Sequence, residues 1–296
     1  MSNKVVIVTD STADLLPETY KERNIVVIPL LVIMNGKSYE DSIEITANEM
    51  YKMVKKTGEL PKTSGVSSEK FVEVFTKIYK ENDGCDIVYT GIGGKLSTTL
   101  QSATIAREDL EFKDHIYLMD SEALSTGTGL MVLKMCDLRD QGKSGKEIVE
   151  TVKKMVPCVR TQFTVNALDY LHKGGRCSGT KKFFGTMLRV RPFLKMFEGV
   201  LTLADKAYGR YEKALDMQIK DLYDHIDIID KDYLFITDSG ECESSKYIFN
   251  HISDDIKKQF KHVYLTHAGC VISSHCGPET VGILYLRNKP LKEVND

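Results

Sequence analysis

The chain has 296 residues, which exceeds the ~100–200 residues of an ordinary single domain and predicts two domains. Hydrophobic residues make up 42% and charged residues 28% of the sequence, a globular balance that argues against a disordered chain. The 40 Lys and Arg residues almost balance the 42 Asp and Glu residues, so the net charge is −2. A nucleic-acid-binding protein should carry a basic excess, and nucleic acid is therefore disfavoured as the ligand.

The apolar segments are too short for export or for membrane insertion. Only four apolar residues separate Lys4 from Thr9, fewer than the ~7–15 of a signal-peptide core. The longest apolar run, residues 25–34, is interrupted by Pro29 and is about half the length of a membrane-spanning helix. The sequence therefore predicts a soluble, cytoplasmic protein and leaves only a transient membrane contact open.

The seven cysteines are scattered, and none forms a Cys-x-x-Cys pair. Their odd number and their spacing support neither a disulfide framework nor a zinc ribbon. We expect reduced, mostly buried thiols. These cysteines are Cys85, Cys136, Cys158, Cys177, Cys242, Cys270 and Cys276.

The first half alternates short apolar runs with helical patterns, which is typical of parallel strands joined by crossover helices. We expect strands over residues 5–8, 25–34, 86–90 and 116–119. Periodic apolar positions predict helices over residues 47–56, 68–80 and 98–110. Asn35-Gly36, directly after the second strand, predicts a two-residue hairpin turn.

The pattern changes after about Pro157, where short strands follow one another more closely. We expect strands over residues 159–165, 193–197, 200–203, 233–237, 262–266 and 281–286, and helices over residues 214–223 and 244–252. Glu198-Gly199 predicts a hairpin, and hence an antiparallel sheet. A boundary near residues 153–157 gives an α/β protein of two domains. Residues 1–155 would form a mostly parallel sheet with flanking helices, and residues 156–296 a largely antiparallel sheet with helices.

Asp10 and Ser11 begin a polar segment, DSTAD, just past the first predicted strand. The carboxyl ends of parallel strands are where ligands bind in open α/β folds. The alternative is structural, with Ser11 or Thr12 capping the next helix. Asp10 and Asp14 are four residues apart, so the Asp-x-Asp spacing of aspartate-nucleophile phosphatases is missing.

Two further hydroxyl-rich segments precede predicted helices. Thr63 and Ser64 stand before Gly65 and could donate to an anion, or could form local turns. Residues 91–98 (GIGGKLST) resemble a phosphate loop, but Leu96 interrupts the required Lys-Ser/Thr pair. Free amides at the helix start still favour an anion, with Ser97 as a hydroxyl donor. Thr98 and Gln101 fit a capping box.

Two more segments stand in the second half. Gly174-Gly175 predicts a helix C-cap and a turn, and Arg176 after it would point into a cleft or lie on the surface. His275 begins a predicted turn, HCGP, before a strand. Together with His262 and His267 upstream, it could indicate a metal site. No carboxylate or cysteine stands at a metal-ligand spacing from these histidines, so we predict one histidine in a cleft and no metal.

Taken together, these segments resemble the DegV family. The resemblance covers nearly the whole chain. It rests on residues 5–14 (VVIVTDSTAD), Ile28-Pro29-Leu30, Thr63-Ser64, Leu96-Ser97 with Gln101-Ser102-Ala103, residues 171–176 (LHKGGR) and residues 275–278 (HCGP). DegV proteins are bacterial two-domain α/β proteins that bind a long-chain fatty acid. Several serve as the binding subunit of fatty acid kinase and hand the carboxylate to a separate kinase. The resemblance therefore implies a lipid carrier that needs no cofactor and does not itself catalyse.

The resemblance also implies roles for individual residues. Thr63 and Ser97 would hold the carboxylate through hydroxyl hydrogen bonds, and Arg176 and His275 would lie beside the head group. The tail would occupy a tunnel of apolar residues from residues 1–155, with residues 156–296 closing over the head group. The remaining head-group neighbours would be Asp10, Ser11, Ser64 and Thr98.

The chain departs from the family pattern at several positions. Gly93-Gly94 stand where the family often has two serines, and Thr98 where it has glycine. Cys177 replaces an aliphatic residue, and Arg191 a lysine. Glu279 replaces glycine close to His275, and a facing carboxylate would raise the pKa of that imidazole. Lipid binding is expected to survive these changes, whereas coupling to a kinase subunit is less firmly implied.

Two other hypotheses stay open. One is a soluble phosphotransferase or hydrolase that uses Asp10 or Ser97 with His275, which would need a base and an orienting acid in one cleft. The other is a sensory binding domain that has no kinase partner.

Overall fold

A four-stranded parallel sheet forms the centre of the N-terminal half. The computed structural model describes residues 4–166, 168–177, 190–240 and 242–294. The strand order is β2-β1-β6-β7, and every neighbouring pair is parallel. The strands are β1 (Val5–Asp10), β2 (Ile25–Ile28), β6 (Asp86–Gly91) and β7 (Ile116–Asp120).

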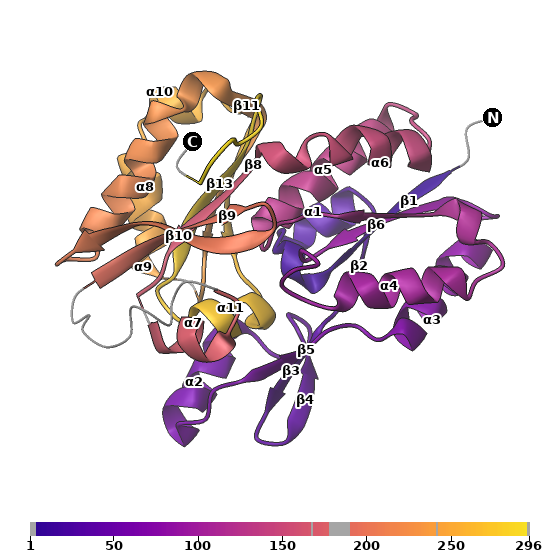
Figure 1. Cartoon of the computed structure of the whole chain (residues 1–296), viewed down its shortest axis with the longest axis horizontal. Helices are drawn as coiled ribbons and strands as arrows, with labels where there is room; N and C mark the ends of the chain where they lie inside the picture. Colours follow the sequence, from indigo (N-terminus) through magenta and orange to yellow (C-terminus); the bar gives the residue numbers. More distant parts are fainter. Residues whose placement is uncertain (1–3, 167, 178–189, 241, 295–296) are drawn as a thin grey trace.

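Helices cover both faces of this sheet (Figure 1). On one face, α3 (Ser68–Glu81) and α4 (Thr99–Glu108) pack on Val8, Ile87 and Tyr89. On the other face, α5 (Thr126–Asp140) and α6 (Gly145–Lys153) pack on Val5, Ile7 and Val88. The short helix α1 (Pro17–Glu22) connects β1 to β2. Alternate residues of β1 thus face the two helical layers, as strand geometry requires.

The C-terminal half contains a six-stranded sheet in the order β10-β9-β8-β13-β11-β12, antiparallel except for the parallel pair β11–β12. Helices α8 (Glu212–Asp224) and α9 (Glu243–His251) pack on one face. The strands are β8 (Val159–Thr164), β9 (Val190–Phe197), β10 (Val200–Tyr208), β11 (Ile229–Asp238), β12 (His262–His267) and β13 (Val281–Arg287). The shorter helices are α7 (Leu168–Gly174), α10 (Asp254–Lys257) and α11 (Cys270–Cys276).

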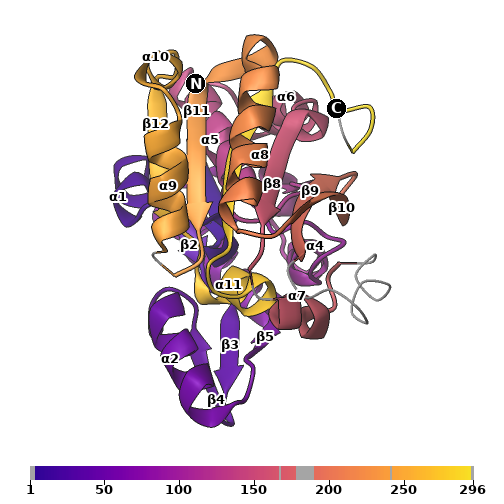
Figure 2. The ribbon, with the colours of Figure 1, turned by 90° about the vertical axis from the view of Figure 1, so that its left-hand side faces the viewer.

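A third, small sheet was not expected from the sequence. It has the order β4-β3-β5 and comprises β3 (Leu31–Met34), β4 (Lys37–Glu40) and β5 (Lys62–Ser64), accompanied by α2 (Ala47–Thr57). Figure 2 shows this unit below α11 and α7, which lie between it and the six-stranded sheet. The predicted single strand over residues 25–34 is therefore wrong. It is divided around Pro29 into β2 of the parallel sheet and β3 of the small one.

The predicted α/β fold class, with one parallel and one largely antiparallel sheet, is confirmed. Both predicted hairpins are present, at Asn35-Gly36 between β3 and β4 and at Glu198-Gly199 between β9 and β10. Asn35 and Gly36 have φ of 50° and 75°, as that turn type demands. No helix among the described residues is long and apolar enough to cross a membrane.

Candidate ligand-binding site

A mostly apolar cavity lies where the two halves meet, with about 860 Å³ of empty space counting its open mouth. From the first half come the apolar side chains of Leu30, Ile92, Leu96 and Leu124. From the second half come those of Phe163, Leu171, Leu201, Ala268, Val271, Ile272 and Leu284. Most of this apolar lining comes from residues 156–296, whereas the sequence placed the tail tunnel in residues 1–155.

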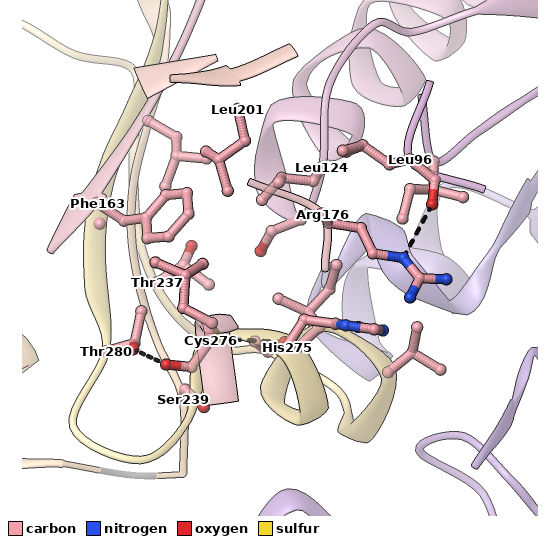
Figure 3. A pocket seen from close by; sticks show the side chains of 18 of the residues that line it. Leu96, Leu124, Phe163, Arg176, Leu201, Thr237, Ser239, His275, Cys276 and Thr280 are labelled. Carbon is pink, nitrogen blue, oxygen red and sulfur yellow. Dashed lines mark hydrogen bonds between the residues drawn. The ribbon is translucent and has the colours of Figure 1, made fainter. Parts of the chain in front are cut away.

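Three hydroxyl groups on the cavity wall are hydrogen-bonded within the protein. Thr237 Oγ1 is hydrogen-bonded to Thr126 and Thr266, and Ser239 Oγ donates to Ser273. Thr280 donates to the carbonyl of Cys276 (Figure 3). Because their polar atoms are bonded to the protein, these residues leave the cavity suited to a hydrocarbon.

His275 lies at the polar end of the cavity, where the small sheet approaches it. Its Nε2 is 2.9 Å from Thr63 Oγ1 of β5, and its buried Nδ1 lies beside the Gly174 backbone. Burial, together with the nearby Arg176 guanidinium, lowers the pKa of His275 to about 4, so the ring is neutral at pH 7. The residue occupies the last turn of α11, so the prediction that it lies in a turn before a strand is wrong.

The end of α7 allows this placement of the histidine. A Cβ atom on Gly174, the last residue of α7, would lie 2.7 Å from His275 Nδ1. Gly175 follows with φ of 67°, which confirms the predicted glycine turn. Arg176 then donates from Nη1 to the Gly174 carbonyl at 2.8 Å and from Nε to the Leu96 carbonyl at 3.5 Å.

The sequence left open whether Arg176 points into a cleft or lies on the surface. Both hold, because Arg176 is exposed and also lines the cavity. Figure 3 shows its guanidinium group directed to the same side as the His275 ring, away from Phe163. The positive charge therefore stands at the mouth, and the apolar wall lies behind it.

Ser97 reaches the cavity from the loop before α4, and it is half-buried. Its Oγ lies 2.8 Å from Thr99 Oγ1 and accepts the Thr99 backbone N–H at 3.3 Å. Thr98 is the N-cap of α4 but makes no side-chain cap bond, so the predicted capping box with Gln101 is wrong. The sequence did not single out Thr99, which is completely buried one residue farther on.

Asp10 and Ser11 lie one layer behind the cavity and are not among the residues that line it. The buried Asp10 carboxylate accepts the backbone N–H of Thr12 and of Ile92, each at 3.0 Å. Burial raises the pKa of Asp10. Ser11 donates to Asp41 at 2.8 Å. These hydrogen bonds hold the loops after β1 and β6. The alternative that Ser11 or Thr12 caps the next helix is wrong for α1, whose N-cap is Leu16.

Ser64 and Thr98 are exposed and do not line the cavity. The Ser64 hydroxyl donates to the neighbouring Gly65 carbonyl at 3.4 Å. Both residues flank the polar end, since a Cβ on Gly65 would lie 3.4 Å from Ser97 Oγ and 3.6 Å from Thr98 Oγ1. They belong to the rim around the site.

Two buried aspartates that the sequence did not single out as a pair hold the start of α11. Asp14 accepts the backbone N–H of Gly269 at 2.9 Å, and Asp41 accepts that of Cys270 at 2.6 Å. Burial raises the pKa of Asp14 well above its usual value and that of Asp41 to about 6. These bonds tie the N-terminal half to the helix that carries His275.

Glu279 is paired with another residue and does not raise the pKa of His275. The Glu279 carboxylate accepts the Ser244 hydroxyl at 3.3 Å, and the pKa of His275 is lowered, not raised. All seven cysteines are buried thiols, as expected. In the described part of the chain, no three His, Cys, Asp or Glu side chains are placed to hold a metal ion.

The geometry gives no support to the hydrolase or phosphotransferase alternative. A catalytic histidine needs an orienting acid on its second ring nitrogen, whereas His275 Nδ1 lies beside the Gly174 backbone. Asp10 is completely buried and does not line the cavity with Ser97 and His275.

Comparison with known proteins places these features in a family. The DegV family model matches residues 4–288. A DegV domain-containing protein of Caldanaerobacter subterraneus subsp. tengcongensis is 34% identical over 286 residues, which are 95% of this chain and 98% of that protein. One of Clostridium acetobutylicum is 31% identical over 291 residues, 96% of this chain and 98% of that protein.

Known structures agree with this. A DegV family protein from Thermus thermophilus, described by its fatty acid binding, superposes with a TM-score of 0.87 at 28% identity, covering 96% of this chain and 99% of that one. DegV from Bacillus subtilis, described as a fatty acid binding protein, gives 0.84 at 26% identity, covering 97% and 100%. A stearic acid-binding protein from Eubacterium ventriosum gives 0.82 at 25% identity, covering 95% and 98%. With its sequence motifs, its fold and its relatives in agreement, the chain belongs to the DegV family.

Proposed function

We propose that this protein binds a long-chain fatty acid in the cavity between its two halves and presents the carboxylate to a separate kinase. One observation carries the proposal: a mostly apolar cavity ends at a cluster of polar groups beside its mouth. These are the Ser97 hydroxyl, the neutral His275 ring and the Arg176 guanidinium on the cavity wall, together with the Thr63 hydroxyl that contacts His275. The fatty acid binding described for the Thermus thermophilus and Bacillus subtilis relatives supports the same ligand class.

The two ends of the site contribute differently to binding. Burying a chain of some fifteen methylenes yields roughly 0.8 kcal/mol for each, so ~12 kcal/mol before the costs of association. A neutral hydrogen bond contributes only ~0.5–1.5 kcal/mol net, and about twice that to a charged group. The tail therefore supplies the affinity, and the polar end fixes the orientation.

The polar end is suited to a carboxylate that must react later. Thr63 and Ser97 offer neutral hydroxyl donors, and His275 adds no charge at pH 7 because its pKa is about 4. A buried double salt bridge would hold the carboxylate electrons more tightly and weaken it as a nucleophile. Arg176 is exposed at the mouth, where it can orient the ligand without enclosing it.

The proposed reaction takes place on the partner. A carboxylate oxygen attacks the γ-phosphorus of ATP, and the products are acyl phosphate and ADP. The kinase supplies ATP and catalysis, and this chain supplies the positioned acid, for use in phospholipid synthesis in the cytoplasm. No cofactor of its own is needed for this role.

Mass spectrometry of the organic extract of the purified protein tests the ligand. We expect about one C14–C18 fatty acid per chain, because that is the length whose tail burial gives useful affinity. Ser97→Ala should retain about tenfold less lipid after washing, since one hydrogen bond to a charged group is lost. The proposal fails if the extract is empty and the protein takes up no added palmitate or oleate.

A coupled assay tests the presentation to a kinase. We expect no acyl phosphate from this protein with palmitate and ATP, and formation of acyl phosphate once the catalytic subunit of a bacterial fatty acid kinase is added. Turnover by this chain alone would instead favour the enzyme hypothesis. Lipid binding without stimulation of the kinase would favour a sensory binding domain.

A further inference from the structure

Within the described residues, the hydroxyl of Ser97 is hydrogen-bonded to one neighbour, Thr99. Ser97 Oγ is 2.8 Å from Thr99 Oγ1, and either atom can donate. It also accepts the Thr99 backbone N–H at 3.3 Å. Thr99 is completely buried at the first position of α4, so the pair is fixed by the fold.

The direction of the Ser97–Thr99 hydroxyl bond decides what Ser97 can offer a ligand. A hydroxyl carries one proton and two acceptor lone pairs. If Ser97 donates its proton to Thr99, it faces the ligand with a lone pair, which repels a carboxylate. If Thr99 donates instead, Ser97 accepts both the hydroxyl and the backbone N–H of Thr99, and its own proton is free for the ligand.

We propose that Thr99 is a positioning residue, which donates its hydroxyl proton to Ser97 and so directs the Ser97 proton to the fatty-acid carboxylate. The inference rests on the proposed function, because an ionised carboxylate can only accept hydrogen bonds and therefore selects this direction. A hydroxyl that accepts hydrogen bonds also donates more strongly, since hydrogen bonds in a chain polarise one another.

The Thr63 hydroxyl lies beside His275. Thr63 Oγ1 is 2.9 Å from His275 Nε2, and which atom donates depends on the tautomer of the ring. His275 Nδ1 lies beside the Gly174 backbone. A neutral ring with its proton on Nε2 donates to Thr63, whereas one with its proton on Nδ1 accepts the Thr63 proton. The tautomer of His275 therefore decides whether Thr63 can donate to the ligand.

Gly65 packs closely against the Thr99 hydroxyl and so restricts its position. A Cβ atom on Gly65 would lie 2.7 Å from Thr99 Oγ1 and 3.4 Å from Ser97 Oγ. The end of β5 therefore packs directly on the Ser97–Thr99 pair. A side chain at position 65 would therefore displace the Thr99 hydroxyl from Ser97, and glycine avoids this.

Palmitate binding by delipidated full-length protein tests the proposal. Thr99→Val keeps the shape of the side chain and removes its hydroxyl, and we expect about three- to tenfold weaker binding, as for one lost hydrogen bond. Thr99→Ser keeps the hydroxyl and should bind within about twofold of wild type. Thr99→Ala removes the same hydroxyl without added bulk, and it replaces Thr99→Val if thermal unfolding shows that the valine variant does not fold.

A double-mutant cycle separates positioning from packing. If Thr99 acts through Ser97, Thr99→Val should cause no further loss in the Ser97→Ala protein. The same loss in both backgrounds, or undiminished binding by the Thr99→Val protein, overturns the proposal. So does undiminished binding by Ser97→Ala. If wild type takes up no fatty acid, the proposed function itself fails; if only the Thr99 variants behave otherwise than expected, the function stands and this inference falls.

Discussion

His275 is the residue whose chemistry depends most on its surroundings. Burial and the Arg176 charge lower its pKa from 6.5 to about 4. Between pH 6.5 and 4 the unfolded chain therefore binds the histidine proton and the folded protein does not. The free energy of unfolding must fall as the pH falls through this window, by up to about 3 kcal/mol for this group.

His275→Gln should remove this part of the pH dependence, because glutamine keeps an N–H for Thr63 but does not titrate. The measurement is urea unfolding of both proteins at several pH values from 4 to 7. Asp41, with its pKa raised to about 6, changes stability in the opposite direction in this window, but it does so in both proteins. The difference between wild type and variant isolates the histidine, and parallel pH profiles would show that its pKa is not lowered.

Individual site residues were predictable from sequence only where a motif placed them at the end of an element. Thr63, Ser97, Arg176 and His275 all lie around the polar end of one cavity. Asp10 was assigned to the same pocket but lies one layer behind it, because a sequence does not show which side of a loop a side chain faces. Thr99 was missed for the same reason, since its role depends on burial against β5.

At the scale of elements, the contact between the end of β5 and the start of α4 holds the two hydroxyls together. Gly65→Ala would place its Cβ 2.7 Å from Thr99 Oγ1. We expect overpacking of about 1–3 kcal/mol, and palmitate affinity lower by on the order of tenfold, because the Ser97–Thr99 pair must move. Thermal unfolding and a palmitate titration measure the two effects.

The neighbouring exposed residue provides the control for this prediction. Ser64→Ala removes only a hydroxyl that bonds to the Gly65 carbonyl at 3.4 Å, so stability and binding should stay near wild type. If Ser64→Ala weakens binding as much as Gly65→Ala, then Ser64 contacts the ligand directly. The rim position described for it would then be wrong.

The elements that were mispredicted have physical explanations. Residues 25–34 look like one strand because apolar character continues across Pro29, yet proline cannot donate to a central ladder, and the chain changes sheets there. Helix α5 was not predicted, because Thr126 to Cys136 are all buried and show no one-sided apolar pattern. Helix α3, with Phe71, Phe75 and Ile78 on one face, was predicted nearly to the residue.

At the scale of the whole molecule, the two halves share more than a cavity. One core cluster joins Val5 and Ile7 of the parallel sheet to Phe235 and Leu284 of the other sheet, with α5 between them. The domain boundary near residue 155 stays a prediction. What could not be read from the sequence is that the apolar wall is built across this boundary, since packing between halves depends on long-range contacts.

A cavity with an apolar wall and a polar end makes a quantitative prediction about ligand length. From decanoate to stearate, each added methylene should strengthen binding about fourfold, the equivalent of ~0.8 kcal/mol, until the cavity is full. Displacement of a bound fluorescent fatty acid measures the series. The length at which the increase stops reports the depth of the cavity.

The same series with Ser97→Ala separates the two ends of the site. Removing a head-group hydrogen bond should weaken every fatty acid by the same factor, because the tail contacts are distant from Ser97 and independent contributions add. Plots of log affinity against chain length should therefore be parallel for the two proteins. A flat wild-type series would mean that the tail lies outside the apolar cavity. Lines that converge with length would mean that Ser97 shapes the wall as well as binding the carboxylate.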